Sequence, residues 1–214
     1  MPDWRSPWRE VPFAVVDVET TGLDARQDEL LSVGVVPIDA GRIVAGACTY
    51  LVVRPVRPPA PANVVVHGIT PGEAMQAPPL RDVVPSIVAA LDGRVPVAHV
   101  ARVERAFLAP VLRRQGARFG PAVLDTDQLL RWLVWREEGL LLTPHLSLAA
   151  AAARLGLPVH RPHHALGDAL TTAQVFLAVA GRLETRGPVS PGSLRNAQRR
   201  LSLARAIRPP TAGR

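Results

Sequence analysis

Three kinds of residue are scarce in this chain of 214 residues. It has a single cysteine, Cys48, no lysine, and only 4% aromatic residues. One cysteine excludes an internal disulfide and a cysteine zinc cluster, which fits a reducing compartment. The low aromatic content argues against a groove that stacks the bases of a long single strand. Because 22 prolines and abundant alanine accompany the absence of lysine, that absence reflects coding bias as much as selection of arginine for phosphate contacts.

Long apolar runs are also missing. No stretch approaches the roughly 20 residues needed to cross a bilayer, and the first residues, MPDWR, lack the hydrophobic region of a secretory signal. We therefore expect a cytoplasmic protein without membrane contact. A length of 214 residues, 48% of them hydrophobic and 20% charged, is enough for one well-buried domain or for one domain with an appendage.

Basic charge is concentrated at the C-terminal end. Residues 182–214 contain eight arginines and the single acid Glu184, a net charge of +7, whereas residues 1–181 contain 17 basic and 17 acidic residues. A Gly- and Pro-rich stretch, GPVSPG at 187–192, is expected to be a linker. The sequence therefore predicts an N-terminal extension over 1–10, a domain over 11–186 and a basic tail over 187–214 with room for a short amphipathic helix.

The order of apolar segments predicts an α/β fold. Strands are expected at the start of the stretch 13–23 and over 30–38, 42–53, 95–98 and 122–124, and helices over 80–91, 101–115, 127–137, 147–155 and 165–183. The first three strands read as an antiparallel meander, and the later strands alternate with helices. This order predicts a mixed central sheet with helices on its faces.

The opening strand ends in two carboxylates. Residues 13–23 read FAVVDVETTGL, and because side chains alternate along a strand, Asp17 and Glu19 share one face. A strand that is apolar on both faces is buried, and ionised carboxylates are costly there unless a cation neutralises them. The pattern favours a divalent-metal site at the strand end. The alternative is a strand that runs out into solvent with an ordinary acidic turn.

Two further acids interrupt faces that should pack. Glu104 lies within an apolar stripe, between Val103 and Phe107, and Asp168 is in register with Thr172 and Phe176 on a later helix. The loop before that helix is rich in imidazole, with His163 five residues upstream of Asp168. Four acids on three elements, with a histidine beside one of them, predict a metal-assisted phosphoryl-transfer or hydrolytic site.

Three segments resemble the motifs of a known family. DVETTGL at 17–23, AHVARVERAFL at 98–108 and HHALGDA at 163–169 are similar to the three exonuclease motifs of the DEDDh 3′–5′ exonucleases, the group that contains the epsilon proofreading subunit of bacterial DNA polymerase III. The pieces HGIT at 67–70, DT at 125–126 and SLA at 147–149 also fall where that family has similar residues. The resemblance covers about residues 11–181 and implies a ribonuclease H-like fold.

The middle motif departs from the family's pattern at three positions. The family usually has Asn, an aromatic residue and Asp where this chain has Val100, Val103 and Glu104. Losing the Asn removes a side-chain hydrogen-bonding group from the site. Replacing Asp by Glu keeps the charge but adds one bond, roughly 1.5 Å, of reach, which would shift or loosen a metal that this residue helps to hold.

The resemblance implies a two-cation site. Oxygen ligands without cysteine suit Mg²⁺ or Mn²⁺ better than zinc. By similarity Asp17 would bridge both cations, Glu19 and Asp168 would complete the tighter site, and Glu104 would act on the second cation, directly or through water. His163 would be the general base, since its intrinsic pKa near ~6.5 suits that task at neutral pH.

Several other residues have a functional and a structural interpretation. His164, next to the predicted base, is expected to face solvent or to be structural. The turn with Thr20, Thr21 and Leu23 resembles one that holds a 3′-terminal nucleotide, with an ordinary tight turn as the alternative. His67 resembles a nucleotide-contacting histidine, with a helix-capping loop as the alternative. The remaining expectations are structural: His99 as a strand-end residue, and Trp132 and Trp135 as core residues.

These observations predict a metal-dependent exonuclease that releases nucleoside monophosphates from the 3′ ends of single-stranded or frayed DNA. One alternative is the same chemistry on RNA or short oligonucleotides, which the neutral charge of residues 1–181 favours slightly because strong backbone tracking needs basic residues. The other is a weakly active nucleic-acid-binding or polymerase-accessory module. A polymerase or another replication or repair protein is the expected partner of the basic tail.

Overall fold

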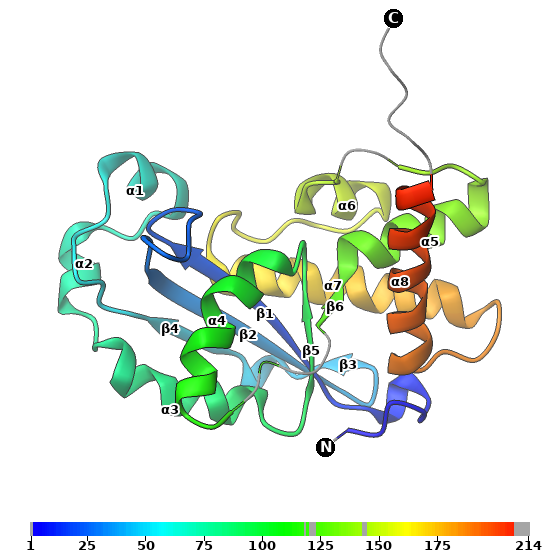
Figure 1. The fold of residues 1–214 in the computed structure, drawn as a ribbon, viewed down its shortest axis with the longest axis horizontal. Coiled ribbons are helices and arrows are strands. Elements are labelled where there is room, and N and C mark those ends of the chain that lie inside the picture. The colour runs from blue at the N-terminus through cyan, green and yellow to red at the C-terminus, as the bar shows by residue number, and fades with distance from the viewer. Residues whose placement is uncertain (1, 118, 120–122, 143–144, 208–214) are drawn as a thin grey trace, which may run out of the picture.

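A computed structural model of the chain describes residues 2–117, 119, 123–142 and 145–207. Its centre is a six-stranded sheet with the order β3-β2-β1-β5-β6, and β4 also pairs with β2 (Figure 1). The strands are β1 (Phe13–Thr20), β2 (Leu30–Asp39), β3 (Arg42–Ile43), β4 (Thr49–Val52), β5 (Val95–Ala98) and β6 (Leu124–Asp125).

The sheet is mixed, as the sequence predicts. Strand β2 runs antiparallel to β1, β3 and β4, whereas β5 is parallel to β1 and β6 is parallel to β5. Parallel pairing brings the carboxyl ends of β1, β5 and β6 to one edge of the sheet. That edge is where ligands bind in open α/β sheets.

The predicted strand over 42–53 is broken into two. A 3₁₀ turn, Ala45–Ala47, separates β3 from β4. The break lies opposite Pro37, whose carbonyl accepts from the Val44 N–H at 2.9 Å. Proline has no N–H to donate in return, so the ladder cannot continue along this edge of β2. The predicted strand over 122–124 is β6, which begins at Leu124, while residue 122 lies outside the described residues.

Eight helices are present in the described part of the chain. They are α1 (Pro61–His67), α2 (Pro71–Gln76), α3 (Leu80–Leu91), α4 (Arg102–Arg114), α5 (Thr126–Glu138), α6 (Leu148–Arg154), α7 (Ala165–Glu184) and α8 (Pro191–Ile207). The five predicted helices are α3 to α7, with ends within one residue of those expected. Helices α1 and α2 were not predicted, whereas α8 lies in the tail for which a short amphipathic helix was considered. Helix α1 begins at Pro61 in a proline-rich stretch that was expected to be a connection, and α8 begins at Pro191 in the expected linker.

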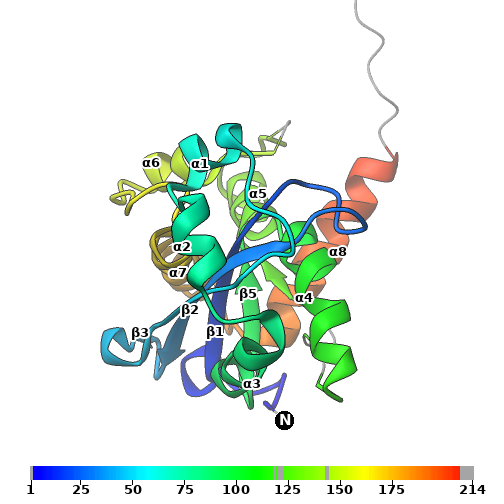
Figure 2. The same cartoon turned by 90° about the vertical axis from the view of Figure 1, so that its left-hand side faces the viewer.

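Helices cover both faces of the sheet (Figure 2). Alternate residues of β1 enter different cores: Phe13 and Val15 pack with α5 and α7, whereas Ala14 and Val16 pack with α3 and α4. Asp17 and Glu19 continue the first of these two series. Their side chains therefore project toward the face that α7 covers.

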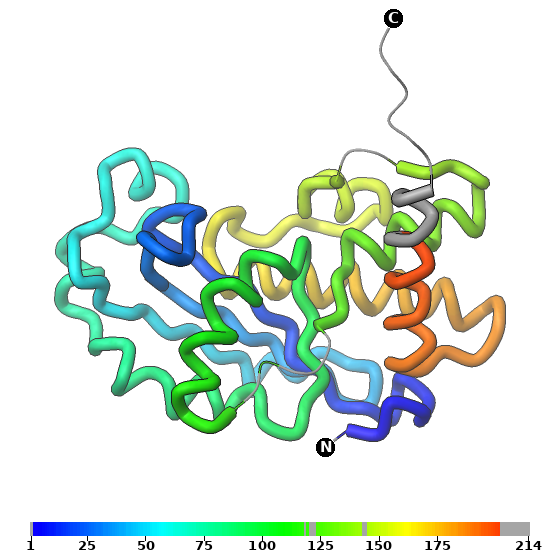
Figure 3. The backbone as a smooth tube through the Cα atoms, in the orientation of Figure 1, coloured from blue at the N-terminus to red at the C-terminus, as the bar shows by residue number. Residues whose placement is uncertain are grey.

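The basic segment after residue 186 packs on the domain. Helix α8 lies against α5 and β6, and Val189, Leu194 and Ala197 are part of the same core cluster as α5 and α7. The N-terminal segment joins this packing, because the Trp8 backbone N–H donates to the Val189 carbonyl at 3.0 Å. The N-terminal segment and the segment after residue 186 were both expected to lie outside the domain, but both pack on it. In the backbone tube they run close to each other (Figure 3). Residues 208–214 of the predicted tail lie outside the described residues.

A membrane-spanning element was not expected. Among the described residues, no helix combines the length and the apolar composition that crossing a bilayer requires.

Candidate active site

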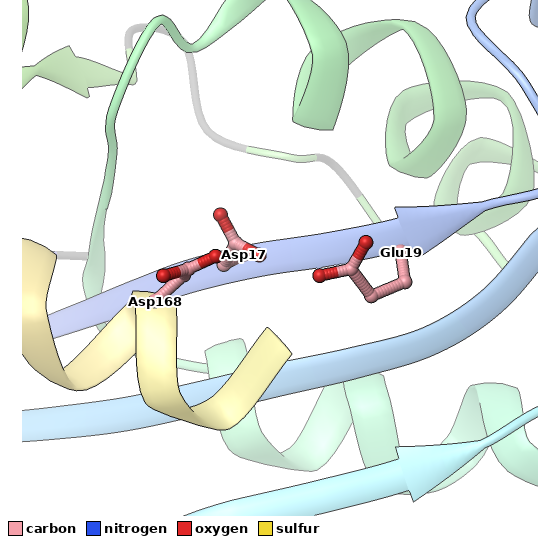
Figure 4. Close-up of side chains that lie close together, drawn as sticks. All are labelled: Asp17, Glu19 and Asp168. Atoms are coloured by element: carbon pink, nitrogen blue, oxygen red, sulfur yellow. The ribbon is translucent and has the colours of Figure 1, made fainter. Parts of the chain in front are cut away.

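Three of the predicted acids converge at the end of β1. Asp17 and Glu19 project from the strand and Asp168 from the first turn of α7, and their carboxylates point toward one another (Figure 4). One oxygen from each lies within 4.8 Å of the others. All three residues are half-buried. The acids from β1 and α7 therefore form one cluster, which is referred to below as the acid cluster.

Two glycines allow α7 to begin this close to the sheet. Gly34 on β2 pairs with Asp17, and a Cβ at Gly34 would lie 2.4 Å from the backbone of Ala165. A Cβ at Gly167 would lie 2.5 Å from the Arg161 carbonyl oxygen. A side chain at either position would push the first turn of α7 away from β1. The separation between Asp168 and Asp17 thus depends on two glycines that carry no chemistry of their own.

Glu104 stands beside the acid cluster rather than in it. Its side chain is 4% exposed, on the face of α4 that also buries Phe107 and Leu108. Its charge contributes to raising the pKa of Asp17. Among the described residues, no hydrogen-bond donor reaches its buried Oε2. A buried carboxylate oxygen without a partner costs free energy of folding unless a cation binds to it or a water donates a hydrogen bond to it.

Burial and mutual repulsion raise the pKa values of these acids. Burial raises the pKa of Asp17 most, and the charges of Glu104, Asp168 and Glu19 raise it further. The pKa of Glu19 is raised to about 7, by burial first and then by Asp168. The pKa of Glu104 is raised to about 8, mainly by burial. Without a cation, the folded protein resists ionising all four carboxylates together.

The donor set fits a hard divalent cation. The acid cluster offers only carboxylate oxygens, and neither cysteine sulfur nor imidazole belongs to it. Such ligands suit Mg²⁺ or Mn²⁺. Glu104 has a buried Oε2 without a hydrogen-bond partner among the described residues, and the pKa of Asp17 is raised. Both features are expected of a cation-binding site in the absence of its positive charge. The residues present therefore fit one or two such cations.

The raised pKa values of Glu19 and Glu104 predict an unusual dependence of stability on pH. The pKa of Glu19 rises from 4.5 to about 7 on folding and that of Glu104 from 4.5 to about 8, so the folded state retains protons that the unfolded chain releases. Stability of the metal-free protein should therefore fall as pH rises from about 4.5 to 8. At ~1.4 kcal/mol for each pKa unit, the two shifts together correspond to a loss of at most about 8 kcal/mol. Thermal unfolding in EDTA at pH 5, 6, 7 and 8 measures it.

Mn²⁺ should reverse this trend, because a bound cation favours the ionised carboxylates. In Mn²⁺ the melting temperature should be higher at pH 8 than in EDTA, with little difference at pH 5. A Glu19→Gln, Glu104→Gln protein provides the control, since it lacks both titrations. If that protein and the parent showed the same pH dependence in EDTA, Glu19 and Glu104 would not be the source of the effect.

The turn before α4 depends on Asp125. The backbone N–H groups of Val100 and Ala101 donate to its two carboxylate oxygens at 3.2 and 3.1 Å. Val100 has a φ of +57°, a strained value for a β-branched residue. Asp125 also accepts from the Asp127 N–H at 3.0 Å and so caps α5. This buried carboxylate holds the start of α4, and through it Glu104, against the end of β6.

The two adjacent histidines have different surroundings. The His163 backbone N–H donates to Asp168 Oδ2 at 2.9 Å while its side chain is exposed. His164 caps α7, where its Nδ1 accepts from the Gly167 N–H at 3.4 Å, and its ring stacks on Tyr50 with the centroids 4.3 Å apart. The expected structural role of His164 agrees with these contacts. The role of His163 as a base stays a prediction.

The turn after β1 is closed by its own hydroxyl groups. Thr20 Oγ1 donates to the Gly22 carbonyl at 2.6 Å, and Thr21 Oγ1 accepts from the Glu29 N–H at 2.9 Å. The Asn63 side-chain amide of α1 donates to the Thr21 carbonyl. Leu23 is 85% exposed at the tip. These bonds are those of an ordinary tight turn, yet they leave an apolar side chain exposed near the acid cluster, so both interpretations of the turn remain.

His67 is buried at the end of α1. Its Nδ1 accepts from the Ile69 N–H at 3.0 Å, and Gly68 ends the helix in the left-handed conformation. Burial lowers the pKa of His67. Among the described residues its Nε2 has no hydrogen-bond partner. One ring nitrogen therefore serves the helix-capping loop, and contact of the other with a nucleotide stays a prediction.

The other singled-out residues are mainly structural. His99 Nδ1 is 2.8 Å from Thr126 Oγ1 and its Nε2 is 3.0 Å from the Leu146 carbonyl oxygen, as expected for a structural histidine. Trp132 is half-buried against the core, but Trp135 is 44% exposed. The core placement is therefore right for Trp132 and wrong for Trp135.

Sequence reasoning missed four residues that support the site: Gly34, Tyr50, Asn63 and Asp125. The Asp125-Thr126 pair was noticed only as a family-like piece, although an acid at the end of a strand and the start of a helix is a helix-cap signal in its own right. An isolated glycine in a strand also signals close backbone approach, which applies to Gly34. Tyr50 and Asn63 carried no local signal.

Comparisons with known proteins agree with this geometry. A family model described as an exonuclease, of the RNase T type, matches residues 14–176. The chain is 36% identical over 193 residues to a DNA polymerase III subunit epsilon-like protein of Rhodobacter capsulatus, covering 89% of this chain and 27% of that relative. It is 30% identical over 194 residues to a PolC-type DNA polymerase III of Thermotoga petrophila, covering 90% of this chain and 14% of that one. The chain thus spans about a quarter or less of these relatives.

Solved structures show the same fold. Exonuclease I superimposes with a TM-score of 0.68 at 19% identity over 82% of this chain and 42% of its own. Exonuclease X, in complex with 5′ overhanging duplex DNA, gives a TM-score of 0.62 at 23% identity over 85% of this chain and 98% of its own. The fold is therefore ribonuclease H-like, with the acid cluster at the end of its first strand. The chain belongs to the RNase T-type, DnaQ-like exonuclease family.

Proposed function

We propose that this chain is a metal-dependent 3′–5′ exonuclease that releases nucleoside monophosphates from single-stranded or frayed DNA ends. The observation that carries the proposal is the acid cluster, with three carboxylate oxygens within 4.8 Å of one another. The buried, unused oxygen of Glu104 beside it supports a place for a second cation. Family membership supports the reaction class, while the direction of attack and the mechanism are the proposal.

The residues divide between two cation positions. Asp17, Glu19 and Asp168 would hold one cation, and Asp17 with Glu104 would hold the other, directly or through water. When bound, such a pair favours attack by water and stabilises the leaving 3′ oxygen of an in-line displacement. Strand β1 and helix α7 hold the carboxylates in fixed positions, so the carboxylates would position the bound cations. Their raised pKa values also mean that cation binding displaces protons from the site.

His163 would accept the proton of the attacking water. Its backbone is tied to Asp168 by the 2.9 Å hydrogen bond, and its exposed ring can reach a substrate in front of the acid cluster. The turn at Thr20, Thr21 and Leu23 would hold the terminal nucleotide, with Leu23 against its base. His67 would contribute its unpaired Nε2. These roles follow from the resemblance, and the exposed side chains of His163 and Leu23 are consistent with them.

One assay tests the proposal and its nearest alternatives. Purified protein is incubated with single-stranded DNA, RNA of the same sequence and a dinucleotide, each in Mg²⁺, Mn²⁺ or EDTA. The proposal expects mononucleotide release from DNA that EDTA abolishes. Faster release from RNA or the dinucleotide would make the RNA or oligonucleotide alternative correct. Binding without release in any metal would favour the accessory-module alternative.

The accessory-module alternative has one specific observation in its favour. The middle motif has Val100 and Glu104 where the family usually has Asn and Asp, which removes one polar group and lengthens another. The relatives named above are a DNA polymerase III subunit epsilon-like protein and a PolC-type DNA polymerase III. Association with a polymerase through the segment 187–214 therefore belongs to the proposal, for the active enzyme as well as for the weak module.

Glu104 should set the choice of metal. A longer carboxylate tolerates Mn²⁺ better than Mg²⁺, which demands near-ideal octahedral geometry. We expect the parent to be faster in Mn²⁺ than in Mg²⁺. Glu104→Asp should change the ratio of the two rates, toward Mg²⁺ if the shorter side chain restores the geometry, or lower both if the backbone at Val100 has shifted to suit Glu. Initial rates of the two proteins in each metal decide between these outcomes.

Glu104→Gln separates charge from shape at the same position. It keeps the length of the side chain but removes the charge, so it should be slow in both metals, by about 10² or more if the second cation is lost. If Glu104→Gln matched the parent in both metals, Glu104 would be a bystander on α4. The site would then have three working carboxylates, and the accessory-module alternative would gain support.

A further inference from the structure

A concave surface lies at the end of α7 opposite to the acid cluster. A hollow of about 430 Å³ opens between α5, the C-terminal end of α7 and α8. Three arginines line it, Arg136, Arg186 and Arg200, together with the polar side chains of Ser193 and Asn196. A hollow of this size can take part of a chain-like ligand as well as a small molecule. It is referred to below as the arginine groove.

Charge in the arginine groove is strongly positive. Arg136 and Arg200 are exposed, and no acidic residue is among those that line it. Glu137, nearby, lies 3.7 Å from Arg186, which neutralises part of that one charge. The described segment 182–200 has the same sign, because it contains five arginines and one acid, Glu184, a net charge of +4. Guanidinium groups around a hollow are the usual means of binding phosphates.

The groove is built into the fold. Leu194 and Ala197 of α8 are buried in the main core, so α8 cannot rotate without exposing them. The guanidinium carbon of Arg195, on the same helix, lies 5.6 Å from the centroid of the Trp4 ring. Arg199 and Arg200 are left facing solvent. Arg200 therefore has a fixed position beside Arg136 and Arg186.

An aromatic pair borders the groove. Trp132 lines it, and the Trp135 ring lies 4.9 Å from that of Trp132. Trp135 is 44% exposed, which is unusual for such a large apolar residue. The Arg136 guanidinium carbon lies 6.0 Å from the centroid of the Trp132 ring, so the pair stands beside the positive charge of the groove. An exposed indole in this position can stack one base while arginines neutralise the neighbouring phosphates.

Helix α7 connects the groove to the acid cluster. Asp168 is in its first turn and Leu183, which lines the groove, is in its last turn. Fifteen residues at 1.5 Å each place them about 22 Å apart along the helix. At roughly 3.4 Å for each nucleotide, the spacing along one strand of duplex DNA, that distance corresponds to about six nucleotides, and an extended single strand covers it with fewer. Only a strand of several nucleotides can touch both places.

We propose that the arginine groove binds the phosphate backbone of a single-stranded nucleic acid several nucleotides upstream of the end that occupies the acid cluster. Arg136, Arg186 and Arg200 contact phosphates, and Trp135 stacks a base at the rim. The inference rests on the proposed function, since it takes its ligand from the substrate of the acid cluster. Residues 1–181, which contain the acid cluster, have no net charge. The arginine groove would therefore supply the basic surface that holds the strand.

Binding in EDTA tests the groove separately from hydrolysis. Without cations the acid cluster repels phosphates, so affinity measured there comes from other surfaces. Fluorescence anisotropy with labelled dT20 and dT4 is compared for the parent and for Arg136→Gln, Arg186→Gln, Arg200→Gln combined. The combined variant should bind dT20 about 10- to 100-fold more weakly and should lose about 2 from the slope of log affinity against log salt. Binding of dT4 should be weak in both proteins.

A matched variant controls for net charge. Arg81, Arg113 and Arg114, all exposed on α3 and α4, are changed to Gln together, so the total charge is the same as in the groove variant. Its affinity for dT20 should stay within about twofold of the parent. Thermal unfolding of all three proteins checks that the fold is kept. A single Arg200→Glu change is a second probe, because Arg200 forms no ion pair among those in the described chain.

The outcomes are distinct. Loss of dT20 binding by the groove variant alone supports the inference, even if the parent hydrolyses nothing and the proposed function fails. Equal dT20 affinity in parent and groove variant overturns it, and so does an equal loss in the groove and control variants. The inference would also be overturned if an acidic peptide, such as a chain of ten glutamates, displaced labelled dT20 at a far lower concentration than unlabelled dT20 does. The groove would then be a protein-docking surface.

Discussion

Asp17→Asn is expected to abolish hydrolysis and at the same time to stabilise the metal-free protein. Asp17 lies at the centre of the acids, and Glu104, Asp168 and Glu19 all raise its pKa. Removing its charge deletes a cation ligand, which should cost about 10³-fold or more in rate. The same change relieves repulsion in the folded state. Thermal unfolding in EDTA at pH 8 should show an increase of about 2–4 °C for each kcal/mol gained.

An exposed acid elsewhere provides the comparison for Asp17. Asp82→Asn on α3 breaks only an exposed ion pair with Arg81, so neither its rate nor its melting temperature should change much. Asp168→Ala should behave like Asp17→Asn in activity, because Asp168 is a member of the same cluster. Near-parental turnover in either cluster variant would remove the two-cation assignment. A fall in the melting temperature of metal-free Asp17→Asn would contradict the repulsion among the acids.

His163→Ala should lower turnover by about 10² to 10⁴-fold, the usual contribution of a positioned general base. The backbone hydrogen bond from His163 to Asp168 does not involve the side chain, so the acid cluster should keep its shape. Cation binding should therefore stay close to that of the parent, which calorimetric titration with Mn²⁺ checks. A loss of rate together with a loss of cation binding would show that His163 positions Asp168 instead of taking a proton.

His164→Asn is the matched variant for the neighbouring histidine. Asparagine retains a side-chain acceptor for the Gly167 N–H and so keeps the cap of α7. Only the stacking of the ring on Tyr50 is lost. We expect a slightly lower melting temperature and a turnover within about threefold of the parent. If instead the large loss of rate followed His164, the register of the third motif would be wrong by one residue.

The sequence was sufficient where one strand or helix decides the outcome. Alternation along β1 predicted that Asp17 and Glu19 share a face, and helical spacing predicted that Glu104 and Asp168 interrupt buried faces. The resemblance joined these acids into one site, and three of them do meet within 4.8 Å. The buried position of Glu104 was predicted from its stripe alone.

Features that depend on contacts between distant segments were not predictable. The break between β3 and β4 depends on Pro37 in the neighbouring strand. The packing of α8 depends on an apolar face that completes a core formed by α5 and α7, and a high arginine content concealed that face. His164 finds its ring partner in Tyr50, more than a hundred residues earlier in the chain. Local patterns contain no information on such partners.

The polarity and metal dependence of cleavage test the central claim most directly. A single-stranded 20-mer is labelled at its 5′ end in one sample and at its 3′ end in another, and each is incubated with the protein across a titration of Mn²⁺. The account predicts that the 5′ label passes through a ladder of successively shorter strands, that the 3′ label is released at once as a mononucleotide, and that both processes stop in EDTA and in Asp17→Asn. Release of a mononucleotide from the 5′ end first, or degradation that persists in EDTA, would contradict it.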